Sequence, residues 1–119
     1  MKNTFLGKRL MGCWYALKGA WRLLREPSIQ VQLVFAVAVV CLGFWFDISK
    51  TEWIAQTLAI GLVLGIEGLN TAIEEIADFI HPDFNDKIGN IKDISAGAVF
   101  VAAAAAAIVG LIIYLPKIF

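Results

Sequence analysis

Long apolar stretches alternate with short polar segments along this chain. The stretches cover about residues 29–46, 53–76 and 94–115. Each approaches or exceeds the roughly 20 residues that a helix needs to cross the hydrocarbon core of a bilayer. The pattern therefore predicts three transmembrane helices over these ranges.

The segment before the first apolar stretch has the period of an amphipathic helix over about residues 3–25. The apolar face carries Leu6, Leu10, Cys13, Trp14, Leu17, Trp21 and Leu24, and the other face carries Lys8, Lys18, Arg22 and Arg25. Tryptophans opposite basic residues are typical of a helix that lies along the membrane interface. This helix either anchors the chain or helps to admit a lipid substrate. Pro27 is expected to end it and to let the chain turn into the bilayer.

Composition supports a membrane protein. Of the 119 residues, 60% are hydrophobic and 17% are charged, whereas a soluble domain has about 45–50% apolar and about 25% charged residues. The expected fold class is an all-α membrane protein that forms a single domain over residues 1–119. The N-terminal segment lacks the compact apolar core and small-residue cleavage site of a signal peptide.

Basic residues are distributed unevenly between the two ends of the predicted spans. Six of the ten precede the first span: Lys2, Lys8, Arg9, Lys18, Arg22 and Arg25. Two more basic residues lie between the second and third spans. Of the last two, one follows the first span and one follows the third. The positive-inside rule then places the N-terminus and the 79–93 loop in the cytoplasm, where ATP is found, and the C-terminus outside.

Polar side chains gather near the end of the second span. On a helix with about 100° per residue, they fall within an arc of roughly 100°. They are Glu67, Asn70, Thr71, Glu74 and Asp78. A solvated last turn would explain Glu75 and Asp78, but Glu67 and Asn70 directly follow an apolar run. Because an unpaired carboxylate in hydrocarbon costs several kcal/mol, we interpret this polar face as a functional site.

Carboxylates on the ATP side of a membrane, with a lysine nearby, suit phosphoryl transfer. That reaction needs a divalent metal on the phosphates, a cation for the developing charge and a base for the attacking hydroxyl. Mg²⁺ prefers oxygen ligands, and Lys92 is a suitable phosphate partner. Asp93 is expected at the N-terminus of the third span, where an acid is favoured and could reach the metal. Alternatively, Lys92 and Asp93 form an interfacial anchor and a helix cap.

Other chemistries find little support. His81 is the single histidine, Cys13 and Cys41 are isolated, and the chain has no Gly-rich phosphate loop and no patch for nucleic acid. Two rival functions remain. In a small oligomeric membrane transporter, Glu67 would bind a proton or cation, but near the midplane and without a role for Lys92 and Asp93. In a structural or regulatory subunit, the polar face would tolerate substitution.

These motifs resemble those of the small bacterial membrane lipid kinases, the diacylglycerol kinase/undecaprenol kinase family. The pattern E-x-x-N-T-A-I-E-x-x-x-D covers Glu67 to Asp78, and K-D-x-x-A-x-A-V covers Lys92 to Val99. The similarity extends over essentially the whole chain, including the N-terminal segment with Tyr15 and Glu26. It implies a homotrimer with sites shared between subunits, in the bacterial inner (cytoplasmic) membrane.

The resemblance also implies a role for each matching residue. Glu67 would take the proton from the lipid hydroxyl, and Glu26 and Glu74 would hold the Mg²⁺ that accompanies ATP. The remaining positions would bind or approach the nucleotide: Tyr15, Asn70, Asp78, Asp83, Asn85, Lys92 and Asp93.

Some positions depart from the family pattern. Gln30 and Gln32 stand where members usually carry Arg and then His or Glu, Asn85 replaces a common loop histidine, and Gly68 replaces a bulky apolar residue. These departures affect the expected contacts with the nucleotide edge and the lipid headgroup. The segment Thr51–Trp53, and Gly110 with Pro116 and Lys117 at the end, are more similar to the undecaprenol branch, so we favour undecaprenol over diacylglycerol as the acceptor.

Overall fold

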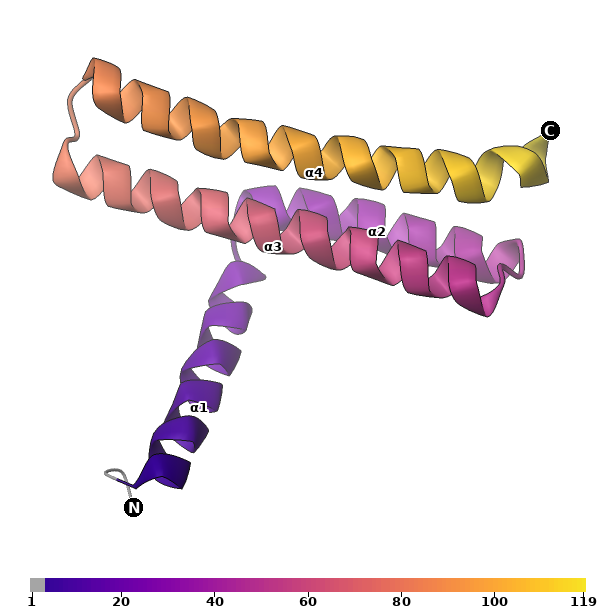
Figure 1. Ribbon diagram of the computed structural model, residues 1–119, viewed down its shortest axis with the longest axis horizontal. Helices are drawn as coiled ribbons and strands as arrows, with labels where there is room; N and C mark the ends of the chain where they lie inside the picture. The colour runs from indigo at the N-terminus through magenta and orange to yellow at the C-terminus, as the bar shows by residue number, and fades with distance from the viewer. Residues whose placement is uncertain (1–3) are drawn as a thin grey trace.

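The computed structural model describes residues 4–119 as α-helices with short connections. The helices are α1 (Phe5–Leu23), α2 (Pro27–Trp45), α3 (Lys50–Ile80) and α4 (Asp86–Ile118). Helices α2, α3 and α4 lie side by side, whereas α1 leaves this bundle at a steep angle (Figure 1). The last three are long and apolar enough to cross a membrane, which confirms the predicted all-α class with three candidate spans. Lys2 and the expected helix start at about residue 3 lie outside the described residues.

Local sequence signals explain where the helices begin. Pro27 occupies the first turn of α2, a position that needs no backbone N–H donor. Ser49 and Glu52 form a capping box: Ser49 Oγ accepts from the Glu52 N–H at 3.2 Å, and Glu52 Oε1 accepts from the Ser49 N–H at 2.9 Å. Asn85 Oδ1 accepts from the Lys87 N–H at 2.9 Å, which caps α4.

Helix α4 begins earlier than the sequence pattern predicts. Its first residue is Asp86, so the loop expected over residues 79–93 is confined to residues 81–85. The expectation that Asp93 stands at a helix N-terminus was wrong, because Asn85 supplies the cap and Asp86 the acid of the first turn. Lys92 and Asp93 therefore lie on the surface of a continuous helix, about two turns from its start.

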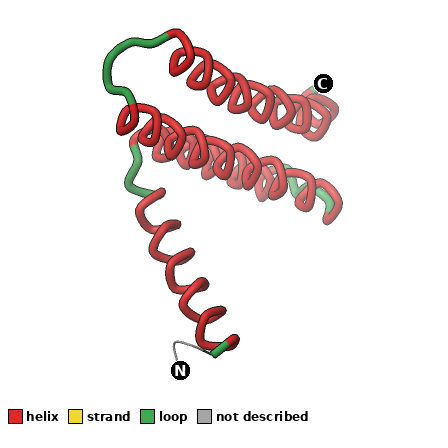
Figure 2. Tube along the Cα trace, turned by 60° about the vertical axis from the view of Figure 1, so that its left-hand side comes forward, coloured by secondary structure: helices red, strands yellow, loops and turns green. Residues whose placement is uncertain are grey.

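Two of the helices are longer than a membrane is thick. Helix α3 has 31 residues and α4 has 33, and at 1.5 Å per residue both exceed the roughly 30 Å hydrocarbon core. The end of α3 and the start of α4 extend past the point where α2 begins (Figure 1), and Figure 2 shows the loop that joins them. The polar face of α3 belongs to this overhanging end.

The opposite end of the bundle holds a small core. Ile48, Ile113 and Tyr114 are buried there, with Trp53 packed against them. Trp53 lies so close to α2 that a Cβ at Gly43 would come within 2.7 Å of its ring, so this contact requires glycine. Elsewhere large apolar side chains are exposed, as expected for surfaces that face lipid or a neighbouring subunit. Examples are Phe35, Phe44, Leu58 and Phe100.

Candidate active site

Asn70 and Glu74 form the centre of the polar face on α3. Asn70 Nδ2 donates to Glu74 Oε1 over 3.1 Å, which is the i to i+4 relationship of adjacent helical turns. Asn70 is buried, whereas Glu74 is exposed. The other amide atom of Asn70, Oδ1, is buried without a hydrogen-bond partner. Because a buried unpaired acceptor is costly, this oxygen is available to a ligand that brings a donor or a cation.

Glu67 lies one turn before Asn70 and is also buried, with 8% of its surface exposed. Its side chain has no protein partner among the hydrogen bonds and ion pairs found within residues 4–119. The neighbouring hydroxyl, Thr71 Oγ1, donates to the Glu67 backbone carbonyl at 3.1 Å, so it satisfies itself within the helix. Glu67 is thus a carboxylate enclosed in the bundle, beside the Asn70–Glu74 pair.

Lys92 brings a positive charge from α4 to this face. Its Nζ lies 2.5 Å from Asp78 Oδ1 on α3, and both side chains remain substantially exposed. Asp78 and Lys92 are 14 residues apart, and they meet because the short connection at residues 81–85 turns α4 back along α3. The sequence prediction that Asp78 and Lys92 share one site is consistent with this contact.

The corner between α1 and α2 packs against α3 beside Glu67. A Cβ on Gly68 would lie 2.7 Å from Leu23 Cδ1, so the absence of a side chain at Gly68 lets the end of α1 approach α3 closely. Glu26 follows directly in this corner. It precedes α2 as the N-cap residue, is half-buried, and makes no side-chain capping bond. Its carboxylate therefore does not cap the helix. It lies at the end of the bundle that carries Glu67.

Several predicted site residues make no hydrogen bond or ion pair with Glu67, Asn70 or Glu74 in the described part of the chain. Tyr15 is 60% exposed on α1, which leads away from the bundle. Asp83 lies in the 81–85 connection, where its carbonyl accepts from His81 Nδ1 at 2.8 Å. Asn85 is occupied as the α4 cap, and Asp93 is exposed on α4. Within residues 4–119, no three carboxylate, imidazole or thiol groups lie close enough to hold a metal ion.

Sequence reasoning missed one polar residue beside the site. Ser95 on α4 is buried, with 6% exposed, and it lines a cavity of about 310 Å³ together with Asn70. The other lining residues are apolar. A serine inside an apolar span is a weak signal by itself, and its proximity to Asn70 depends on how α4 packs on α3.

Comparison with known proteins identifies the family. The family model for prokaryotic diacylglycerol kinase matches residues 14–114. The chain belongs to this family. It is a lipid kinase, a membrane protein that uses ATP to phosphorylate an alcohol. The alternative function, a small membrane transporter, is not favoured.

Individual relatives agree with this assignment. Undecaprenol kinase of Bacillus subtilis (strain 168) is 39% identical over 105 residues, which cover 87% of this lipid kinase and 85% of the relative. Diacylglycerol kinase of Escherichia coli (strain K12) is 28% identical over 95 residues, covering 80% and 76%. Diacylglycerol kinase of Haemophilus influenzae is 28% identical over 102 residues, covering 85% and 86%.

Proposed function

We propose that this lipid kinase transfers the γ-phosphoryl group of Mg·ATP directly to the hydroxyl of undecaprenol, at the end of the bundle where α3 and α4 extend past α2. The observation that carries the proposal is the hydrogen-bonded Asn70–Glu74 pair one turn from the buried, unpartnered carboxylate of Glu67. An apolar helix has no structural need for such a group, and phosphoryl transfer to a lipid needs a base, phosphate-binding groups and a membrane boundary together.

Glu67 acts as the general base in this proposal. It accepts the proton of the lipid hydroxyl while the hydroxyl oxygen forms its bond to the γ-phosphorus. The bond between that phosphorus and the bridging oxygen of ATP breaks in the same in-line displacement, and ADP leaves with the bonding electrons. The products are the lipid phosphate and ADP. Burial suits this role, because an enclosed carboxylate can be held beside the reacting hydroxyl while competing water is excluded.

The residues at the site are suited to Mg²⁺. Glu74 supplies an exposed carboxylate, Asn70 supplies a buried amide oxygen without a partner, and carboxylate and amide oxygens are ligands that Mg²⁺ accepts. Glu74 and Glu26 would hold the ion, which neutralises charge on the ATP phosphates when it is bound. Lys92, Asn70 and Asp93 would contact the triphosphate. Asp78 would position Lys92 through their ion pair.

The remaining nucleotide contacts would come from Tyr15 on α1 and from Asp83 and Asn85 in the connection before α4. Tyr15 reaches the site only if it serves a neighbouring chain or if α1 shifts. The resemblance to the family implies the same arrangement for the metal, in which one chain supplies Glu26 and its neighbour supplies Glu74. We therefore propose a homotrimer with shared sites.

The proposed membrane orientation follows from charge and from the angle of α1. Helix α1 would lie as an amphipathic helix along the cytoplasmic interface, with its basic face toward anionic headgroups. The overhanging ends of α3 and α4 would then reach into the cytoplasm, where ATP is present, and the C-terminus would lie outside. Glu67, next to the corner of α1, would stand at headgroup depth, where a lipid hydroxyl resides. The chain would act in the bacterial inner membrane as a single domain over residues 1–119.

Undecaprenol is the proposed acceptor because the undecaprenol kinase relative is more similar than the diacylglycerol kinases that were compared, 39% against 28%. The test is transfer of labelled phosphate from Mg·ATP to undecaprenol and to diacylglycerol, side by side, in detergent-solubilised protein supplied with lipid. We expect undecaprenol to be phosphorylated with the higher kcat/KM. A preference for diacylglycerol would reverse the acceptor assignment, and no transfer to either would overturn the proposed function.

A further inference from the structure

A second polar group lies in the bundle, far from the candidate active site. The Tyr114 hydroxyl on α4 lies 3.1 Å from the Val39 backbone oxygen on α2 and also bonds the Gln56 amide on α3. One side chain thus connects all three spanning helices. Gln56 is 97% buried, since only 3% of its surface is exposed, and its Nε2 has no partner. The single hydroxyl proton cannot serve the Val39 oxygen and Gln56 Oε1 at once. Turning the amide would let Gln56 Nε2 donate to the hydroxyl, but it would leave Oε1 unpartnered instead.

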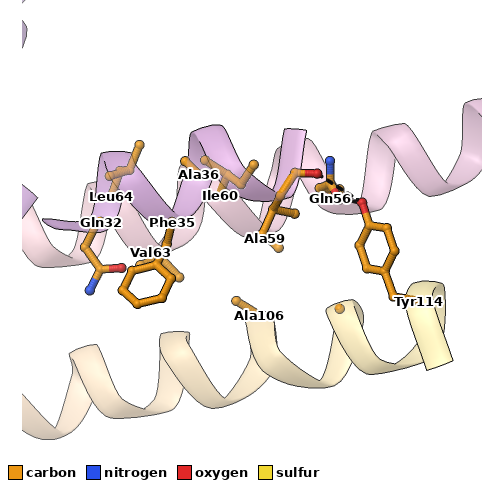
Figure 3. A pocket seen from close by; sticks show the side chains of 12 residues that line it. Gln32, Phe35, Ala36, Gln56, Ala59, Ile60, Val63, Leu64, Ala106 and Tyr114 are labelled. Atoms are coloured by element: carbon orange, nitrogen blue, oxygen red, sulfur yellow. Dashed lines mark hydrogen bonds between the residues drawn. The ribbon is translucent and has the colours of Figure 1, made fainter. Parts of the chain in front are cut away.

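This polar group closes one end of a cleft between the three helices. The cleft has a volume of about 160 Å³, and its walls are mainly apolar. Figure 3 shows Phe35 and Val63 along it, Ala106 on the opposite helix, and Gln56 with Tyr114 at one end. Because Tyr114 ties α4 to both α2 and α3 at this end, the helices are held at a fixed spacing and the cleft stays open.

The cleft leads toward Glu67 along one face of α3. The buried positions Gln56, Val63 and Glu67 are spaced by seven and four residues, so they fall on the same side of the helix. Val63 and Leu64, which line the cleft, lie one turn from Glu67. Gln56 lies eleven residues from Glu67, which corresponds to about 16 Å along the helix axis. The lining of the cleft therefore ends about one turn of α3 from Glu67, the place where the lipid hydroxyl would react.

We propose that this cleft holds the part of the lipid tail nearest the reacting hydroxyl, and that the Tyr114–Gln56 pair forms its floor. The inference rests on the proposed function, because a hydroxyl at Glu67 fixes where the tail begins. The walls of the cleft are mainly apolar, as a hydrocarbon chain requires, and its volume of about 160 Å³ is small. A single-chain alcohol would occupy it fully, whereas a two-chain lipid would leave its second chain in the bilayer. The cleft thus favours a polyprenyl-type alcohol.

Gly110 allows the cleft to be filled without disturbing the protein. It lines the cleft, and a Cβ there would have no other atom within 4 Å. A Gly110→Leu variant would place its side chain where the tail is proposed to lie, and Gly110→Ala would occupy only a small part of that space. Gly61→Leu is the matched control. Gly61 also has open space around its Cβ position and lies at similar depth on α3, but it is exposed and does not line the cleft.

The experiment measures kcat/KM for a series of single-chain prenols of increasing length, with the wild type and the three variants. For the wild type, we expect kcat/KM to rise with chain length and to level off once the tail spans from Glu67 to Gln56. Gly110→Leu should lower kcat/KM for long prenols about tenfold, mainly through KM, which corresponds to about 1.4 kcal/mol of lost binding. The same variant should leave kcat/KM for the shortest prenol and the KM for ATP unchanged. Gly110→Ala should have a small effect, and Gly61→Leu none.

Photo-crosslinking gives a second measurement that is independent of turnover. A polyprenol carrying a photoreactive group on the isoprene unit that would reach Gln56 should label residues at that end of the cleft, and Gly110→Leu should abolish that label. An unchanged chain-length profile in Gly110→Leu, or a label outside the cleft, would overturn the tail site. So would dissociation of the oligomer in Gly110→Leu, because the cleft would then hold a neighbouring subunit. A wild type that phosphorylates no lipid alcohol would instead refute the proposed function.

Discussion

Lys92 on α4 bonds Asp78 on α3, with 2.5 Å between Nζ and Oδ1. This ion pair joins the two helices next to the Asn70–Glu74 pair. Because both side chains are partly exposed, the pair contributes little to stability, about 0–1 kcal/mol. Lys92 can therefore exchange its carboxylate partner for ATP phosphates at low cost. In the absence of nucleotide, Asp78 keeps the ammonium group at the site.

Substitutions at the two positions should separate charge from positioning. Lys92→Ala removes a phosphate partner and should raise the KM for ATP by at least tenfold, because hydrogen bonds to charged groups are worth about 1.5–3 kcal/mol. Asp78→Asn leaves the lysine in place without its carboxylate and should raise the KM for ATP only a few-fold. Steady-state kinetics with varied ATP at saturating lipid measures both. Equal losses in the two variants would mean that Asp78 itself binds the nucleotide.

Glu74 should control metal-dependent nucleotide binding. Glu74→Gln keeps an acceptor for the Asn70 amide but removes a negative charge, so the affinity for Mg·ATP should fall about tenfold or more while metal-free ATP binds no worse. Calorimetric titration with and without Mg²⁺ measures the difference. Glu75→Gln is the control, since Glu75 is an exposed neighbour on α3. A Glu74→Gln variant that still distinguishes Mg·ATP from ATP would remove Glu74 from the proposed metal site.

Shared sites predict complementation between inactive variants. Glu26→Gln and Glu74→Gln should each be inactive alone. If one chain supplies Glu26 and its neighbour Glu74, random mixing of equal amounts restores both carboxylates in about a quarter of the sites. The measurement is lipid kinase activity after the two purified variants are mixed, dissociated and reassembled. Activity that stays at background would place both carboxylates in the same chain.

The Tyr114 hydroxyl should stabilise the bundle. Tyr114→Phe removes its bonds to Val39 and Gln56 and leaves the Gln56 amide buried with no partner. The expected cost in the free energy of unfolding is about 1–3 kcal/mol. Denaturation in mixed detergent micelles measures it, with Tyr15→Phe as the control, because Tyr15 is exposed and makes no hydrogen bond in the part of the chain that the structure describes. Equal stabilities of the two variants would contradict this role for Tyr114.

Periodicity and apolar length predicted the helices, because crossing a bilayer imposes a strong constraint on every residue of a span. The grouping of Asn70 with Glu74 was also predictable, since residues four apart on a helix are neighbours. The start of α4 was not, because residues 86–93 are too polar to read as part of a span and their helix depends on the Asn85 cap and on packing against α3. Ser95, Gln56 and Tyr114 gave no sequence signal, because their partners lie on other helices.

Substitution of Glu67 tests the central claim most directly. Phosphate transfer to undecaprenol and Mg·ATP binding should be measured on the same preparations of wild type, Glu67→Gln and the control Glu75→Gln. A general base contributes about 10²–10⁴-fold to the rate, so Glu67→Gln should lose transfer by at least a hundredfold, bind Mg·ATP with nearly wild-type affinity, and differ clearly from Glu75→Gln, which should remain active. Near-normal transfer by Glu67→Gln would contradict the assignment of Glu67 as the base.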